Sequence, residues 1–124
     1  MAGRVGRLAA LASLALTLAA CSGGPPAPTL AVPSGALVLR VTDSTFQPAQ
    51  LTAPTGAAFV LYFDNADGLP HNAVIRAADG TREFEGDVFS GPAQRVYDVP
   101  ALASGSYALR CDVHPEMSGA LSVP

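Results

Sequence analysis

Four side chains in this sequence could together bind a metal ion. Cys111, His114 and Met117 lie within the seven-residue stretch CDVHPEM, and His71 follows a proline in the stretch LPHN. Two imidazoles, a thiolate and a thioether form the donor set of a blue-copper electron-transfer centre, in which methionine is the weak axial ligand. Zinc also binds thiolate and imidazole, but structural zinc sites take further cysteines or histidines rather than methionine. The residue types therefore favour one type 1 copper ion.

The composition supports a single site. Apart from Met1 and Cys21, these four residues are all the histidines, cysteines and methionines of the sequence. Any one of them alone is more often a core or surface residue than a ligand. The complete set, with no donor left over, points to one metal centre.

Short β-type stretches must position these ligands. Alternating apolar residues predict strands near residues 37–42, 59–63 and 107–111, and shorter runs at 73–75 and 120–123 are further candidates. Weaker candidates lie at 84–89 and 95–99, and Gly, Pro, Asp and Asn separate the runs. We therefore predict an all-β fold, a Greek-key β-sandwich of seven or eight strands. Cys111 would end a strand, and a tight loop would turn His114 and Met117 back toward the same metal.

The N-terminal segment has the anatomy of an export signal. Arg4 and Arg7 precede an apolar run that ends at Ala20, and this run is too short to span a bilayer. The ending LAAC resembles the lipobox of bacterial lipoproteins, which implies acylation of Cys21; the alternative is an ordinary signal peptide cut after Ala20. We expect a lipoprotein signal peptide at 1–20, a Pro/Gly-rich tether at 21–35 and one domain at 36–124. The domain would then lie outside the cytoplasm, anchored by lipid to a bacterial membrane.

Charge and cysteine content narrow the partners. Loss of the two signal-segment arginines leaves five Arg and no Lys against ten acids, a formal net charge of −5. Such a surface argues against nucleic-acid binding and favours a basic partner. With Cys21 acylated, Cys111 is a lone exported thiol, for which metal ligation is one role.

The motif also carries a family resemblance. C-x-x-H-x-x-M with an upstream PHN resembles the plastocyanin and amicyanin branch of the cupredoxins, and the spacing between His114 and Met117 is similar to that of amicyanin. The resemblance extends from Leu37 to Val123. It implies a copper site at one end of a sandwich, with His71 buried and the ring edge of His114 exposed. It also implies that Asn72 bonds across to the cysteine loop.

Two residues depart from this family pattern. Asp112 stands where Ser or Thr is common, and Val113 stands where plastocyanin and amicyanin have Pro. Unlike proline, Val113 has an N–H, so we expect a second hydrogen bond to the thiolate, which would raise the reduction potential. The charge of Asp112 would act in the opposite direction. Neither departure replaces a ligand.

The predicted function is transport of single electrons between redox partners, such as a cytochrome or a membrane oxidoreductase, by a monomer that is not an enzyme. Copper delivery or buffering is the alternative, although delivery sites tend to be open and rich in Met or His. A binuclear copper centre is excluded, because it needs a second cysteine. We expect Leu69, Pro70 and Pro115 to form an apolar docking rim around His114, and Asp67 and Glu116 to steer a basic partner.

Overall fold

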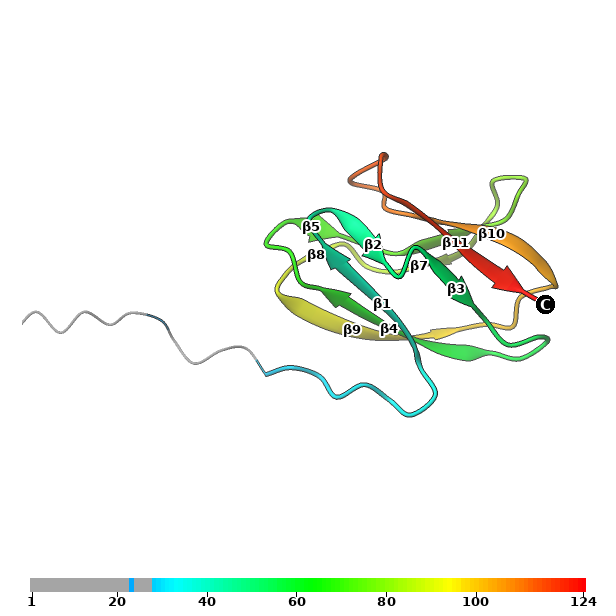
Figure 1. The fold of residues 1–124 in the computed structure, drawn as a ribbon, viewed down its shortest axis with the longest axis horizontal. Coiled ribbons are helices and arrows are strands. Elements are labelled where there is room, and N and C mark those ends of the chain that lie inside the picture. Colours follow the sequence, from blue (N-terminus) through cyan, green and yellow to red (C-terminus); the bar gives the residue numbers. More distant parts are fainter. Residues whose placement is uncertain (1–22, 24–27) are drawn as a thin grey trace, which may run out of the picture.

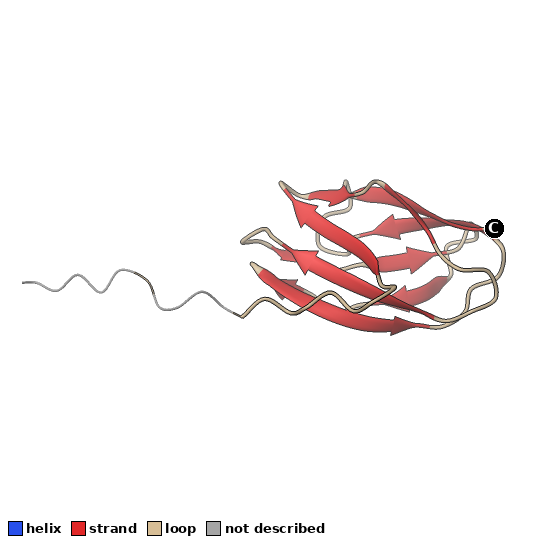
Figure 2. Cartoon of the chain, turned by 60° about the horizontal axis from the view of Figure 1, so that its bottom comes forward, coloured by secondary structure: helices blue, strands red, loops and turns tan. Residues whose placement is uncertain are grey.

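Two β-sheets packed face to face form the domain (Figures 1 and 2). The computed structural model describes Gly23 and residues 28–124; the predicted signal peptide and Cys21 lie outside the described residues. One sheet has the order β2-β1-β4-β9, the other has the order β3-β11-β10-β6-β7, and β5 pairs with β8 in a small third sheet. The strands are β1 (Leu37–Thr42), β2 (Thr45–Gln47), β3 (Gln50–Thr52), β4 (Phe59–Asn65), β5 (Pro70–His71), β6 (Val74–Arg76), β7 (Arg82–Glu85), β8 (Phe89–Ser90), β9 (Ala93–Val99), β10 (Gly105–Arg110) and β11 (Ser118–Val123).

The predicted all-β sandwich is confirmed, but the strand count was too low. The described residues contain eleven strands rather than seven or eight. Five of them, β2, β3, β5, β6 and β8, are only two or three residues long, which is too short for alternation to show in a sequence; of these, β6 was anticipated as the short apolar run at 73–75. The weak candidate at 84–89 divides into β7 and β8.

The core lies between the two large sheets and follows the predicted alternation. Leu39, Leu61 and Phe63 from one sheet and Ile75 and Leu109 from the other are each 0% exposed. Burial of such a side chain contributes about 1.5–3 kcal/mol, so these positions fix which face of each strand turns inward.

Strand register brings the ligand segments to one end of the sandwich. Arg110, the last residue of β10, pairs with Val74 of β6 and with Ser118 of β11. Cys111 therefore lies beside the beginning of β6. Because β6 begins only three residues after His71, the two ligand segments are neighbours. The β5–β8 pair closes this end, and Gly91 lets the chain pass close to the end of β4, because a Cβ there would clash with the Asn65 carbonyl oxygen.

The described part of the tether is docked on the domain. Residues before β1 turn back along the outside of the sheet (Figure 1), where the Leu30 carbonyl accepts a 2.8 Å hydrogen bond from the Tyr62 hydroxyl. The Leu30 N–H donates to the side chain of Gln94 on β9 at 3.3 Å. No helix among the described residues has the length and apolar character needed to cross a bilayer.

Candidate metal centre

Three predicted ligands converge at the end of the sandwich. The Nδ1 atoms of His71 and His114 lie 3.8 and 4.0 Å from the Cys111 sulfur, and the three donor atoms all lie within 4.8 Å of one another. The two imidazole rings are 4.5 Å apart between centroids. Donor atoms of a common metal are separated by such distances, so the folded chain already holds these three in a ligating arrangement.

His71 is fixed on its far side by a carboxylate. Its ring is 0% exposed, and Nε2 lies 3.1 Å from Oδ2 of Asp67. An Nε2–H that donates to this carboxylate leaves the Nδ1 lone pair free to face Cys111. Burial lowers the pKa of His71, and the Asp67 carboxylate opposes that shift. The neutral imidazole is the form that binds a metal.

Asp67 is itself held by the backbone. Its two carboxylate oxygens accept hydrogen bonds from the N–H groups of Asp43 and Ser44, at 2.8 and 2.7 Å. The Ser44 N–H is the main cause that holds the pKa of Asp67 below its usual range. This carboxylate is 14% exposed and already has partners, so it is a poor candidate for the partner steering expected of it.

Asn65 organises the turn between β4 and His71. It is 0% exposed, and its side-chain amide donates to the carbonyls of Leu69 and Phe89, at 2.9 and 2.8 Å. Its Oδ1 accepts from the Asp67 N–H at 3.1 Å. Burying this amide with its hydrogen bonds satisfied specifies one loop conformation.

The second ligand loop runs from Cys111 to Met117. A backbone hydrogen bond of 3.0 Å from the Met117 N–H to the His114 carbonyl closes a tight turn. Cys111 and Met117 are 3% and 2% exposed and belong to the same apolar cluster, whereas His114 is half-buried. The loop thus sends the sulfur residues inward and leaves His114 nearer the surface.

Asn72 connects the two ligand segments. Its Nδ2 donates to Oδ2 of Asp112 at 3.0 Å, and its Oδ1 accepts from the Asp112 N–H at 2.9 Å. In the described part of the chain the thiol has polar contacts with the two imidazoles and not with Val113, so the expected hydrogen bond from Val113 stays a prediction. The expected docking residues are accessible: Leu69 is 52% exposed, Pro115 is exposed and Pro70 is partly buried.

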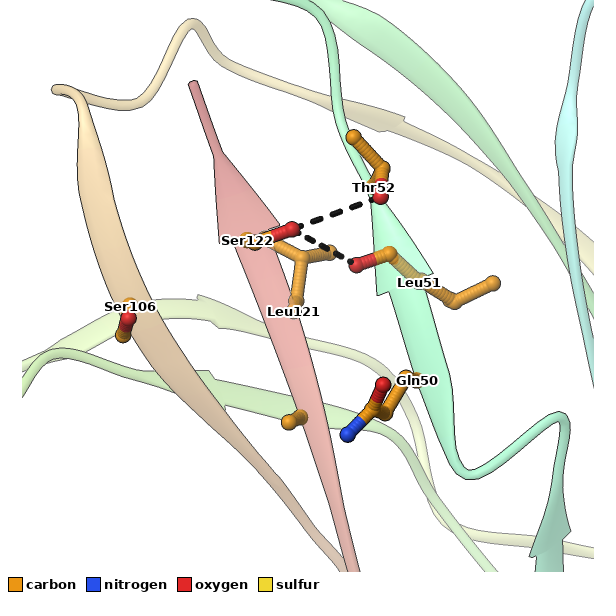
Figure 3. A pocket seen from close by; sticks show the side chains of 7 residues that line it. Gln50, Leu51, Thr52, Ser106, Leu121 and Ser122 are labelled. Atoms are coloured by element: carbon orange, nitrogen blue, oxygen red, sulfur yellow. Dashed lines mark hydrogen bonds between the residues drawn. The ribbon is translucent and has the colours of Figure 1, made fainter.

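A separate hollow of about 230 Å³ lies on β3 and β11 (Figure 3). Thr52 and Ser122 face each other there with their hydroxyls 3.3 Å apart, and Gln50 and Ser106 complete its polar lining. None of the residues that line it is titratable or belongs to the donor cluster. It is therefore no rival to the metal centre.

Sequence reasoning missed three residues that shape the site: Asn65, Asp67 as a partner of His71, and Arg82. Asn65 falls among the Asn and Asp residues that separate the apolar runs, and Asp67 was expected only to steer a basic partner. The spacing of Asp67 four residues before His71 was the available signal, but in a chain without helices that spacing does not by itself imply contact. For Arg82 no signal existed, because its contact with Asp112 spans 30 residues.

The chemistry of the donor set suits copper. One soft thiolate, a thioether and two imidazoles suit both Cu(I) and Cu(II), and the buried sulfur is reached by two imidazole nitrogens that have no competing partner role. A β-sandwich with this set at one end defines a copper protein of the electron-transfer class.

The comparisons with known proteins agree. The model of the cupredoxin-like domain matches residues 8–123, and the chain belongs to that family. It is similar to the methylamine utilization protein MauL of Methylophilus methylotrophus, with 29% identity over 114 residues that span 90% of this chain and 64% of that protein. Amicyanin of Paracoccus versutus superposes with a TM-score of 0.59 at 25% identity, covering 75% of this chain and 85% of amicyanin. Auracyanin of Roseiflexus castenholzii gives 0.63 at 18% identity, covering 73% and 98%. The predicted amicyanin-like relationship, the copper cofactor and the non-enzymatic class are confirmed.

Proposed function

We propose that the mature protein is a membrane-anchored, extracytoplasmic blue-copper protein that carries single electrons between redox partners. His71, Cys111, His114 and Met117 would bind one copper ion. The observation that carries this proposal is the convergence of both histidines and the cysteine, whose donor atoms all lie within 4.8 Å of one another.

The chain's own residues prepare the site for electron transfer. Bound copper would supply the exchange between Cu(I) and Cu(II). Asp67 orients His71 from behind, and the nearly complete burial of Cys111 and Met117 keeps water away from the sulfur atoms. A site held by the fold in this way needs little rearrangement when its charge changes, because the donors do not have to move.

The half-buried His114 is the proposed point of electron exchange. The rim expected around it consists of Leu69, which is 52% exposed, the partly buried Pro70 and the exposed Pro115. Val113, next to His114 in the chain, is 42% exposed and adds a further apolar side chain to this rim. A small apolar rim of this kind suits the brief encounters of redox proteins. The partner would be a cytochrome or a membrane oxidoreductase that docks on this rim.

Reconstitution of the domain with copper tests the site. We expect one copper per chain, with an intense visible band that Cys111→Ser abolishes because the band needs the copper–thiolate bond. Met117→Leu should keep the colour and shift the potential, since a thioether would bind copper only weakly. A Cys111→Ser variant that stayed blue would contradict the ligand assignment.

The same spectrum separates electron transfer from copper delivery or buffering. A closed, sulfur-bonded site gives the intense band and a small copper hyperfine splitting, and it should release copper slowly to a chelator. Rapid loss of copper to the chelator, without the band, would favour delivery.

Lipidation of Cys21 is the basis of the proposed anchor. Mass spectrometry of the membrane fraction should find an acylated N-terminal Cys21. A Cys21→Ser variant should leave the membrane with its copper site unchanged. A soluble wild-type form that begins at another residue would refute the anchor and leave the copper proposal standing.

A further inference from the structure

An ion pair joins Arg82, in the sheet that contains β10, to Asp112, the residue that follows Cys111. We call this contact the bridge. Arg82 of β7 donates from Nη1 to Oδ2 of Asp112 at 2.9 Å and from Nη2 to Oδ1 at 2.8 Å. Such a two-point contact fixes orientation as well as distance. Arg76 of β6 lies 3.9 Å from the same carboxylate, and Glu85 shares Arg82 at 2.9 Å.

The bridge continues into the site through Asn72. The Asp112 carboxylate that receives Arg82 also accepts from the Asn72 side chain, and the Asp112 N–H returns a hydrogen bond to Asn72. Asn72 is 1% exposed and donates further to the Gly86 carbonyl at 3.1 Å. The Asp112 carboxylate thus connects Asn72, which follows His71, to the guanidinium of Arg82, and Asp112 itself follows Cys111.

Charge gives this bridge a consequence beyond stability. An ionised Asp112 beside Cys111 favours the more positive oxidation state of a bound metal, which lowers its reduction potential. Arg82 places an opposite charge in direct contact with it and cancels much of that field. Partly exposed ion pairs add little to folding stability, so the main effect should appear at the site.

We propose that Arg82 is a positioning residue of the copper site: it holds Asp112 across the ligand loop and offsets its charge, so that the reduction potential stays high despite the acid next to Cys111. This inference rests on the proposed copper site. The bridge contact itself involves only described residues and does not depend on the metal.

The test compares Arg82→Gln, Asp112→Asn and the double variant in the full mature chain with copper. Arg82→Gln should lower the midpoint potential, because it exposes the charge of Asp112. Asp112→Asn should raise it, because Arg82 and Arg76 then have no counter-charge. The double variant should lie between the single variants and close to the wild type, and all three should keep the visible band.

Arg40→Gln is the matched control. Arg40 pairs with Asp64 on the opposite sheet, so this variant changes the net charge equally without touching the bridge. Equal potential shifts for Arg40→Gln and Arg82→Gln would reduce the effect to net charge and overturn the proposal. Shifts of the same sign for Arg82→Gln and Asp112→Asn would overturn it as well.

A measurement on the copper-free chain separates this proposal from the proposed function. Hydrogen exchange of the Asp112 amide, which donates to Asn72, should become severalfold faster in Arg82→Gln and stay unchanged in Arg40→Gln. Unchanged exchange in Arg82→Gln would show that Arg82 does not hold the loop. A wild-type chain that bound no copper would refute the proposed function, while the exchange result would still decide the positioning role.

Discussion

The two loops that carry the histidine donors are built in opposite ways. The loop before His71 is tied down from inside: Asn65 bonds to two carbonyls, and Asp67 bonds to two backbone N–H groups and to the imidazole itself. The loop from Cys111 to Met117 has one short internal backbone hydrogen bond and exposed residues at 112, 113, 115 and 116. It is held mainly by Asp112, through Asn72, which follows β5, and Arg82 of β7.

Because of this difference, the two histidines have different roles in the site. His71 is a fixed donor with no route to solvent, so it contributes rigidity. His114 is half-buried in the open loop, so it contributes contact with a partner. A metal centre that must both resist rearrangement and exchange electrons needs one donor of each kind.

The comparison predicts very different results for removal of the two rings. In His114→Gly, added imidazole should enter from solvent and restore the visible band. In His71→Gly the ring is lost from a closed cavity and Asp67 loses its partner, so the free energy of unfolding should fall by about 3 kcal/mol without rescue by imidazole. Denaturant unfolding and copper titration with imidazole measure both effects. Equal rescue of the two variants would contradict this difference in roles.

Removal of the carboxylate behind His71 is the next largest change. Asp67→Ala leaves the N–H groups of Asp43, Ser44 and His71 unpaired, and we expect a loss of about 2–3 kcal/mol in the free energy of unfolding. Glu116→Ala, which removes an exposed acid from the other loop, should change stability by less than about 0.5 kcal/mol. Similar losses in the two variants would mean that the loops are equally constrained.

A charge introduced on the docking rim tests whether electrons are exchanged at the surface around His114. Leu69→Glu should slow electron self-exchange about tenfold at low salt, because both partners then bring negative charge to the same contact, and added salt should restore part of the rate. Val38→Glu introduces the same charge on β1, at a similarly exposed position, and should have little effect. Stopped-flow or NMR line broadening gives the rate. No slowing with an intact visible band would place electron exchange on another face.

The smallest predicted effect concerns Val113 in the open loop. Val113→Pro removes the N–H that we expect to bond to the thiolate, and the potential should fall by about 40 mV, equivalent to a hydrogen bond of about 1 kcal/mol. Val113→Ala keeps the N–H and should leave the potential near that of the wild type. Voltammetry of the two variants decides the point, and an unchanged or higher potential in Val113→Pro would remove this hydrogen bond from the account.

What the sequence revealed of the site depended on distance along the chain. Cys111, His114 and Met117 lie within one short stretch, so their spacing alone indicated a common metal. His71 could be added because no other histidine was left. The strands β1 and β4 were also predictable, because alternate residues of each belong to the core, although Tyr62 on the other face of β4 is buried as well.

The contacts that set the character of the site were not predictable in this way. Arg82 meets Asp112 only because β6 and β7 form a hairpin beside the end of β10, which is a property of the register and not of either residue. In the sequence Asp67 resembles an exposed acidic residue of a turn. In the structure the N–H groups of Asp43 and Ser44 donate to its carboxylate. Long-range pairing decides such contacts, and local patterns do not encode it.

The contact of the tether at Leu30 with the domain bears on how the protein would be oriented relative to a membrane. Leu30 bonds to Gln94, which pairs with Asp64 near the end of β4 from which the His71 loop departs. If Cys21 carries the lipid, the stretch from Cys21 to Thr29 can reach at most about 30 Å from that point. The lipid would then pull the copper end, rather than the end where β11 finishes, toward the bilayer. A redox partner embedded in the same membrane would find the imidazole edge already within its reach.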